Sequence, residues 1–130
     1  MHKSILPQGW PRPKGYSNGV LAEGRTLFIA GQIGWNENEQ FESDDFVHQV
    51  EQALKNIVAV LKAAGGEPQQ IARMTWHVVD KREYLGRLAE IGKVYKNVLG
   101  AVYPAMSLVQ VVALVEDRAR VEIEATAVIP

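Results

Sequence analysis

An apolar stripe with helical spacing between residues 46 and 64 is the clearest pattern along the chain. Its members recur every three or four positions and are Phe46, Val50, Ala53, Leu54, Ile57, Leu61 and Ala64. Ser43 can cap the amino end of this helix, and the acids Asp44 and Asp45 suit the positive end of the helix dipole. Gly65 and Gly66 predict its end, because glycine adopts the left-handed C-cap conformation at little cost.

A second helix is predicted over residues 83–99 by a similar stripe, formed by Tyr84, Leu88, Ile91, Tyr95 and Val98. Gly92 weakens this helix by about 1 kcal/mol relative to alanine. Between the two helices, residues 71–79 alternate in a way that predicts a strand, with Trp76 on one face and His77 on the other.

The remaining strands are predicted near the two ends of the chain. Residues 20–22 and 26–30 are expected to form a hairpin. Its second strand is apolar on both sides, so it should be central in the sheet and covered on both faces. Residues 105–115 and 119–129 are expected to form a closing pair of strands. The order ββαβαββ predicts an α+β sandwich of helices on a sheet.

Composition limits the classes of protein to consider. The 130 residues suit one domain, which we assign to residues 16–130 after an extended, proline-containing arm over residues 1–15. A formal net charge of −1 offers no field to hold nucleic acid or an anionic membrane. No apolar run approaches the roughly 18 residues of a membrane span. The absence of cysteine excludes disulfides and a cysteine nucleophile, and it fits a cytoplasmic location.

Candidate chemistry concentrates in the last predicted strand. Glu122 and Glu124 are two positions apart, so both project from one face of that strand. The simpler interpretation is a solvated acidic face; the alternative is that one carboxylate points into a cleft and handles a proton or positions a water. The three histidines lack the spacing of metal ligands, so no metal site is expected.

Five short segments form a set that is specific only in combination: 15–20 (GYSNGV), 29–33 (IAGQI), 61–66 (LKAAGG), 103–105 (YPA) and 122–125 (EIEA). From about Lys14 to Ile129, the chain resembles the reactive-intermediate deaminase family, also called RidA, YjgF or L-PSP. The resemblance implies a chorismate-mutase-like α+β fold with two helices on one face of a mixed sheet. It also implies a homotrimer with small-molecule clefts between subunits. The activity implied is cofactor-free hydrolysis of enamines and imines, of the 2-aminoacrylate type, to 2-oxoacids and ammonia.

The same resemblance assigns roles to particular side chains. Glu122 is expected to hold the attacking water, and Tyr16 is expected to act beside it. Gln32, Ser107 and Trp35 are expected to line the substrate cleft. Purely structural roles stay open for three of them: Tyr16 can pack at a subunit edge, Gln32 can satisfy loop backbone, and Trp35 can pack within an exposed loop.

The chain departs from the family pattern at three cleft positions. Met106 stands where the family has the arginine that binds the substrate carboxylate, Ala30 where it has a serine, and Gly92 where it has an asparagine. A thioether supplies neither the charge nor the paired donors of a guanidinium. We therefore expect weak activity on 2-aminoacrylate and a cleft suited to an uncharged or aromatic ligand.

Three functions compete at this point. The first is a divergent deaminase whose substrate is not anchored by the usual arginine, and the second is a non-catalytic trimer that binds a small ligand. The third is an endoribonuclease, which the net charge and the lack of a basic and aromatic stripe disfavour. Another cation in the cleft, such as Arg12 or Arg73, would favour the first function, whereas a wholly apolar cleft would favour the second.

Overall fold

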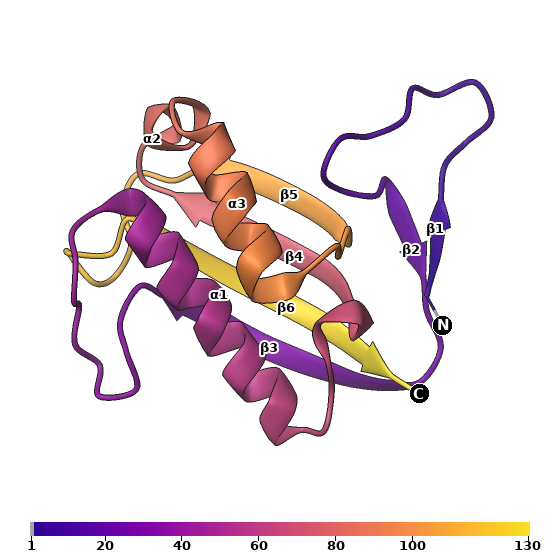
Figure 1. Cartoon of the computed structure of the whole chain (residues 1–130), viewed down its shortest axis with the longest axis horizontal. Coiled ribbons are helices and arrows are strands. Elements are labelled where there is room, and N and C mark those ends of the chain that lie inside the picture. Colours follow the sequence, from indigo (N-terminus) through magenta and orange to yellow (C-terminus); the bar gives the residue numbers. More distant parts are fainter. Residues whose placement is uncertain (1) are drawn as a thin grey trace.

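The main sheet has four strands in the order β3-β6-β4-β5 (Figure 1). In the computed structural model, which describes residues 2–130, these are β3 (Arg25–Ile33), β6 (Val121–Ile129), β4 (Ile71–Val78) and β5 (Ala105–Gln110). β6 pairs antiparallel with both β3 and β4, whereas β4 and β5 run parallel. The sheet is therefore mixed, with β6 and β4 as its inner strands.

Two helices, α1 (Phe46–Ala63) and α3 (Leu88–Leu99), lie side by side on one face of this sheet (Figure 1). The apolar stripe of α1 packs on the sheet, and Leu54, Ile57 and Leu61 are fully buried there. Each such side chain contributes about 1.5–3 kcal/mol by its removal from water. A short helix, α2 (Lys81–Leu85), precedes α3, and a 3-10 turn, η1 (Pro68–Gln70), precedes β4. The predicted α+β fold class is confirmed.

The ends of α1 follow the expected chemistry with one change. Asp45 is the N-cap, because its carboxylate accepts a hydrogen bond from the backbone N–H of His48 (3.1 Å). Ser43, which we expected in that role, instead accepts from the backbone N–H of Asp45 (2.9 Å). At the carboxyl end, Gly65 has a φ of 80°, the left-handed conformation that was predicted for this glycine.

The expected amino-terminal hairpin is wrong in its pairing. β2 (Gly19–Leu21) pairs with β1 (Lys3–Ile5), inside the segment predicted to be irregular, and the two form a ribbon outside the main sheet (Figure 1). β3 is an edge strand rather than a central one. We call the sheet face away from α1 and α3 the open face; there Phe28 is 80% exposed. Within residues 2–130 no helix covers this face, so the apolar pattern of β3 exceeds what this chain alone buries.

Two further boundaries differ from the predictions. The helix expected over residues 83–99 is divided, because α2 ends at the C-cap Gly86 and α3 begins at Leu88. The strand expected over residues 105–115 ends at Gln110, and the apolar residues after it are in a loop. β5 is an edge strand whose neighbour β4 ends at Val78; the backbone N–H of Val111 still donates to the Val78 carbonyl (2.8 Å), and residues 112–115 lie beyond the end of β4.

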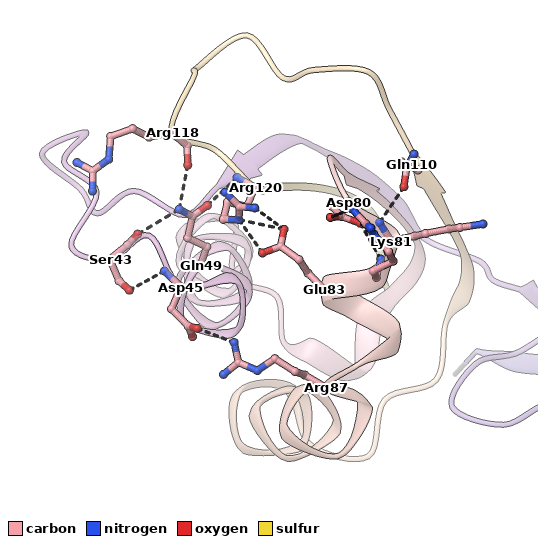
Figure 2. A network of polar contacts seen from close by, with 11 residues as sticks. Ser43, Asp45, Gln49, Asp80, Lys81, Glu83, Arg87, Gln110, Arg118 and Arg120 are labelled. Carbon is pink, nitrogen blue, oxygen red and sulfur yellow. Dashed lines mark hydrogen bonds and ion pairs between the residues drawn. The ribbon is translucent and has the colours of Figure 1, made fainter.

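A buried glutamine of α1 ties three segments together (Figure 2). Gln49 is 0% exposed; its amide N–H groups donate to the carbonyls of Ser43 (3.1 Å) and Arg118 (3.0 Å). Its Oε1 accepts from the backbone N–H of Arg120 (2.8 Å). Arg120 in turn pairs with Glu83 of α2 (2.8 Å). The start of α1, the turn before β6 and the helix α2 are thus held in one arrangement.

We expect Gln49→Leu to lower the free energy of unfolding by about 3 kcal/mol, because each buried backbone group left unpaired costs about 1–3 kcal/mol. Gln52→Leu is the matched control, since Gln52 lies on the same helix and bonds only to the side chain of Asn56. Its effect should stay below about 1 kcal/mol. Urea unfolding of both variants measures the difference, and equal losses would contradict the role given to Gln49.

Candidate functional site

A cavity of about 470 Å³ lies between the main sheet and the segment formed by α2 and α3. Trp76 of β4 and Met106 and Leu108 of β5 form its floor. These side chains face the helices because alternate residues of a strand point to the same side. Tyr84 of α2 and Tyr95 of α3 form its walls. The sheet and the helices therefore form a half-open, mainly apolar chamber, which we call the cavity.

Three aromatic rings define the interior of the cavity. The ring centroid of Trp76 lies 6.1 Å from that of Tyr84, edge to face, and 6.4 Å from that of Tyr95. The Tyr95 hydroxyl donates to the carbonyl of Val102 (2.6 Å). Burial raises the pKa of Tyr84 and of Tyr95 above the usual phenol value. Both phenols therefore stay protonated at neutral pH, and neither can serve as a general base.

The floor contains an unpaired donor. Trp76 is 2% exposed, and its indole Nε1 is buried without a hydrogen-bond partner. A buried donor without a partner costs about 1–3 kcal/mol, so most buried polar groups in folded proteins are paired. The nitrogen has essentially no exposed surface, so among the described residues this N–H group is an unpaired donor inside the floor.

The rim of the cavity is cationic. Lys14 and Lys96 line it, and no acidic side chain among residues 2–130 does. Within residues 2–130 neither ammonium belongs to an ion pair. Arg12 borders a neighbouring hollow beside Tyr16, and Arg73 lies on the open face of the sheet. The two arginines considered from the sequence are therefore not cavity residues, and two lysines are.

Three of the predicted site residues meet at the cavity: Tyr16, Met106 and Gly92. Tyr16 is held at the mouth because its neighbour Ser17 is buried and donates from Oγ to the carbonyl of Tyr103 (2.5 Å). A β-carbon added at Gly92 would meet nothing within 4 Å, so this glycine leaves open space beside α3. The position where the family carries an asparagine is thus a gap in the wall.

The other predicted residues lie away from the cavity. Glu122 alternates with the buried residues of β6, so it projects to the open face. There it fits closely over the backbone, because a β-carbon at Gly31 would lie 2.6 Å from its Oε2. Ser107 is exposed and points away from its cavity-lining neighbour in β5. The Gln32 amide N–H donates to the carbonyl of Ala30 (3.0 Å), and both residues lie within β3, where its pairing with β6 shifts register, rather than in a loop.

Trp35 packs within its own loop. Its ring centroid lies 5.8 Å from that of Phe41, and its carbonyl accepts from the side chain of Asn56 (2.8 Å). It does not line the cavity. Of the predicted site residues, Tyr16, Met106 and Gly92 therefore lie at the cavity, whereas Glu122 lies on the other side of the sheet within one chain.

Sequence reasoning missed several cavity residues. The sequence placed Tyr84, Leu88 and Tyr95 in the apolar stripe of one helix and Trp76 on one face of a strand, with no role at a site. A usable signal was present, since two tyrosines flank Gly92 in an otherwise aliphatic stripe. Large aromatic rings beside a glycine indicate a helix surface that is not close-packed.

Metal-binding clusters and membrane-spanning helices are two further features that bear on the class of site. Within residues 2–130, no three His, Asp or Glu side chains come together as a metal site. Over the same residues, no helix is both long and apolar enough to cross a bilayer.

Known proteins resemble this chain along most of its length. Residues 11–129 match the family described as Endoribonuclease L-PSP. Human 2-iminobutanoate/2-iminopropanoate deaminase is 34% identical over 114 residues, which cover 87% of this chain and 79% of the human protein.

Solved structures agree with this sequence match. The Rid family protein YyfB from Yersinia pestis superimposes with a TM-score of 0.86 at 34% identity, over 98% of each chain. Escherichia coli TdcF, solved with bound serine, gives a TM-score of 0.69 at 33% identity and covers 98% of this chain and 99% of its own. Because the family match extends over nearly the whole chain and the fold agrees, this protein belongs to the Endoribonuclease L-PSP family, the RidA and YjgF group that its motifs indicated.

Proposed function

We propose that this protein is a divergent enamine/imine deaminase, which hydrolyses a C=N bond and releases ammonia from a substrate not anchored by the usual arginine. The observation that carries the proposal is the cavity, an apolar chamber with Tyr16 and Met106 below a rim of unpaired lysines. Such a chamber can hold a small organic molecule by its apolar part and attract its anionic end. Two relatives support the proposal: the human protein is named as an imine deaminase, and TdcF was solved with an amino acid bound.

The reaction balances without a cofactor. An enamine first takes a proton at carbon and loses one from nitrogen, and so becomes an imine. The oxygen of a water then bonds to the imine carbon while one water proton passes to the nitrogen, which gives an adduct with a hydroxyl and an amino group on one carbon. The hydroxyl loses its proton, the nitrogen gains one, the C–N bond breaks, and ammonia leaves as the carbonyl of a 2-oxoacid forms. We assign to the Glu122 carboxylate the removal of the water proton, and to the Tyr16 phenol a hydrogen bond to the substrate at the mouth of the cavity.

A second copy of the chain is needed to complete this site. Glu122 and the cavity lie on opposite sides of one sheet, so a single chain does not bring them together. We propose a homotrimer in the cytoplasm, in which the open face is covered by neighbouring copies and each cleft joins one cavity to a neighbour's Glu122. The exposure of Phe28 on the open face supports this assembly, because a large apolar side chain at that position favours burial in an interface.

Light scattering on the purified protein should therefore give a mass about three times that of one chain. Phe28→Glu should lower that mass, because it puts a charge into the proposed interface. Leu85→Glu is the matched control, since Leu85 is also exposed but belongs to α2 on the helix side of the sheet. A stable 14.4 kDa monomer at micromolar concentration would contradict the shared cleft.

The proposed activity is tested with imines made in situ by an amino-acid oxidase in the presence of catalase. The disappearance of the imine and the release of ammonia are followed with and without this protein. We expect at least one imine to be hydrolysed faster with the protein than by water alone. If the protein bound ligands in the cavity but accelerated no imine in the panel, it would be a binding trimer and the proposal would be wrong.

A further inference from the structure

The cavity is larger and more apolar than a three- or four-carbon imine requires. Building on the proposed function, we propose that its substrates are imino acids with bulky apolar side chains, branched or ring-sized, whose carboxylate is held at the rim by Lys96 and Lys14. The side chain then occupies the chamber between the sheet and the helices. Size, wall chemistry and charge support this assignment independently.

The volume of the cavity is the first argument. About 470 Å³ lies within the range of pockets that enclose much larger ligands than pyruvate imine. Gly92 lines this space without a side chain, and a β-carbon at this position would meet nothing within 4 Å. A small imine would leave apolar walls in contact with trapped water, which is unfavourable compared with filling them.

The wall chemistry is the second argument. Leu88, Ile91 and Leu108 offer aliphatic surface, and Trp76 and Tyr84 offer ring surface. Each methylene that a substrate buries against such walls improves its affinity by about fourfold. A phenyl or isobutyl group therefore gains far more from this cavity than a methyl group does.

The charges at the rim are the third argument. Within residues 2–130 of one chain, Lys14 and Lys96 are the cations that line the cavity and no carboxylate lines it; in the proposed assembly the neighbour's Glu122 is the one acid that joins them. Lys96 lies in the last turn of α3, on the same helix as the gap at Gly92. An ammonium binds a carboxylate as a point charge and without the paired geometry of a guanidinium. Selection among substrates therefore depends more on the side chain here than in an arginine-bearing site.

Binding of the stable 2-oxoacid products tests this inference without relying on turnover. Isothermal titration calorimetry should show that phenylpyruvate and 4-methyl-2-oxopentanoate bind at least about 10-fold more tightly than pyruvate. Gly92→Phe should fill the cavity and abolish binding of the two bulky acids. Circular dichroism verifies that this variant folds, and replacing a helical glycine should not destabilise α3.

Lys96→Gln should weaken phenylpyruvate binding by about fivefold or more, because it removes a charge that holds the carboxylate. Lys93→Gln is its control, since Lys93 is exposed on the same helix and does not line the cavity. Pyruvate binding as tight as phenylpyruvate, or no effect of Gly92→Phe, would overturn the inference. Binding of bulky oxoacids without hydrolysis of any imine would instead overturn the proposed function and leave the binding specificity standing.

Discussion

Glu122→Gln is expected to lower kcat/KM for imine hydrolysis by about 100-fold or more, because positioned general bases contribute roughly 10²–10⁴-fold to such reactions. Glutamine keeps the size of the side chain that fits over Gly31, but it cannot take a proton from water. The oxidase-coupled imine assay measures the loss, and light scattering verifies that the assembly is unchanged.

Glu124→Gln is the matched control for this experiment. Glu124 is exposed, lies two residues away on the same face of β6, and is not part of the proposed machinery. We expect its activity to remain within about twofold of the wild type. Similar losses for both variants would indicate a general effect of charge on the open face, and no loss for Glu122→Gln would remove Glu122 from the reaction.

Hydrolysis of small imino acids such as 2-iminopropanoate is expected to be slower here than in an arginine-bearing relative, by more than about 10-fold and up to several hundredfold. A charge-assisted hydrogen bond to a carboxylate contributes roughly 1.5–3 kcal/mol, and a bidentate pair contributes more. Met106 lines the cavity and supplies neither charge nor donors.

Met106→Arg should restore part of this activity, and only part, because Ala30 and Gly92 also lack the polar groups of the family pattern. Met106→Lys separates charge from geometry: we expect a smaller gain, since an ammonium lacks the paired donors of a guanidinium. The assay compares both variants with the wild type on 2-iminopropanoate. Wild-type turnover equal to that of an arginine-bearing relative would show that the missing arginine does not limit this site.

Elements whose pattern is settled by local packing were predictable from the sequence. The stripe of α1, its end at Gly65 and the alternation of β4 all reflect contacts within one chain, and the structure has them as expected. The strand pairing near the amino end was not predictable in the same way. The pattern around Phe28 correctly indicated apolar side chains on both faces of β3. It did not indicate which strand pairs with β3 or what covers the open face.

The candidate site was predictable only in part, for a related reason. Motif resemblance identified Tyr16, Met106 and Gly92, which the fold brings together at the cavity. The lysines of the rim lie on a loop and on an exposed helix position, where sequence patterns carry little information. Which residues share a cavity depends on tertiary packing, and in the proposed assembly the meeting of Glu122 with a cavity depends on a second copy as well.

Subunit complementation tests the central claim, an imine deaminase whose site joins two copies, most directly. Glu122→Gln leaves the cavity intact but removes the carboxylate, and Gly92→Phe fills the cavity but leaves Glu122 intact. Each variant alone should therefore be nearly inactive. Trimers reassembled from an equal mixture should regain about a quarter of the wild-type activity, because about one cleft in four then combines an intact cavity with an intact Glu122. Mixed trimers that stay as inactive as the separate variants, beside an active wild type, would contradict a site shared between copies.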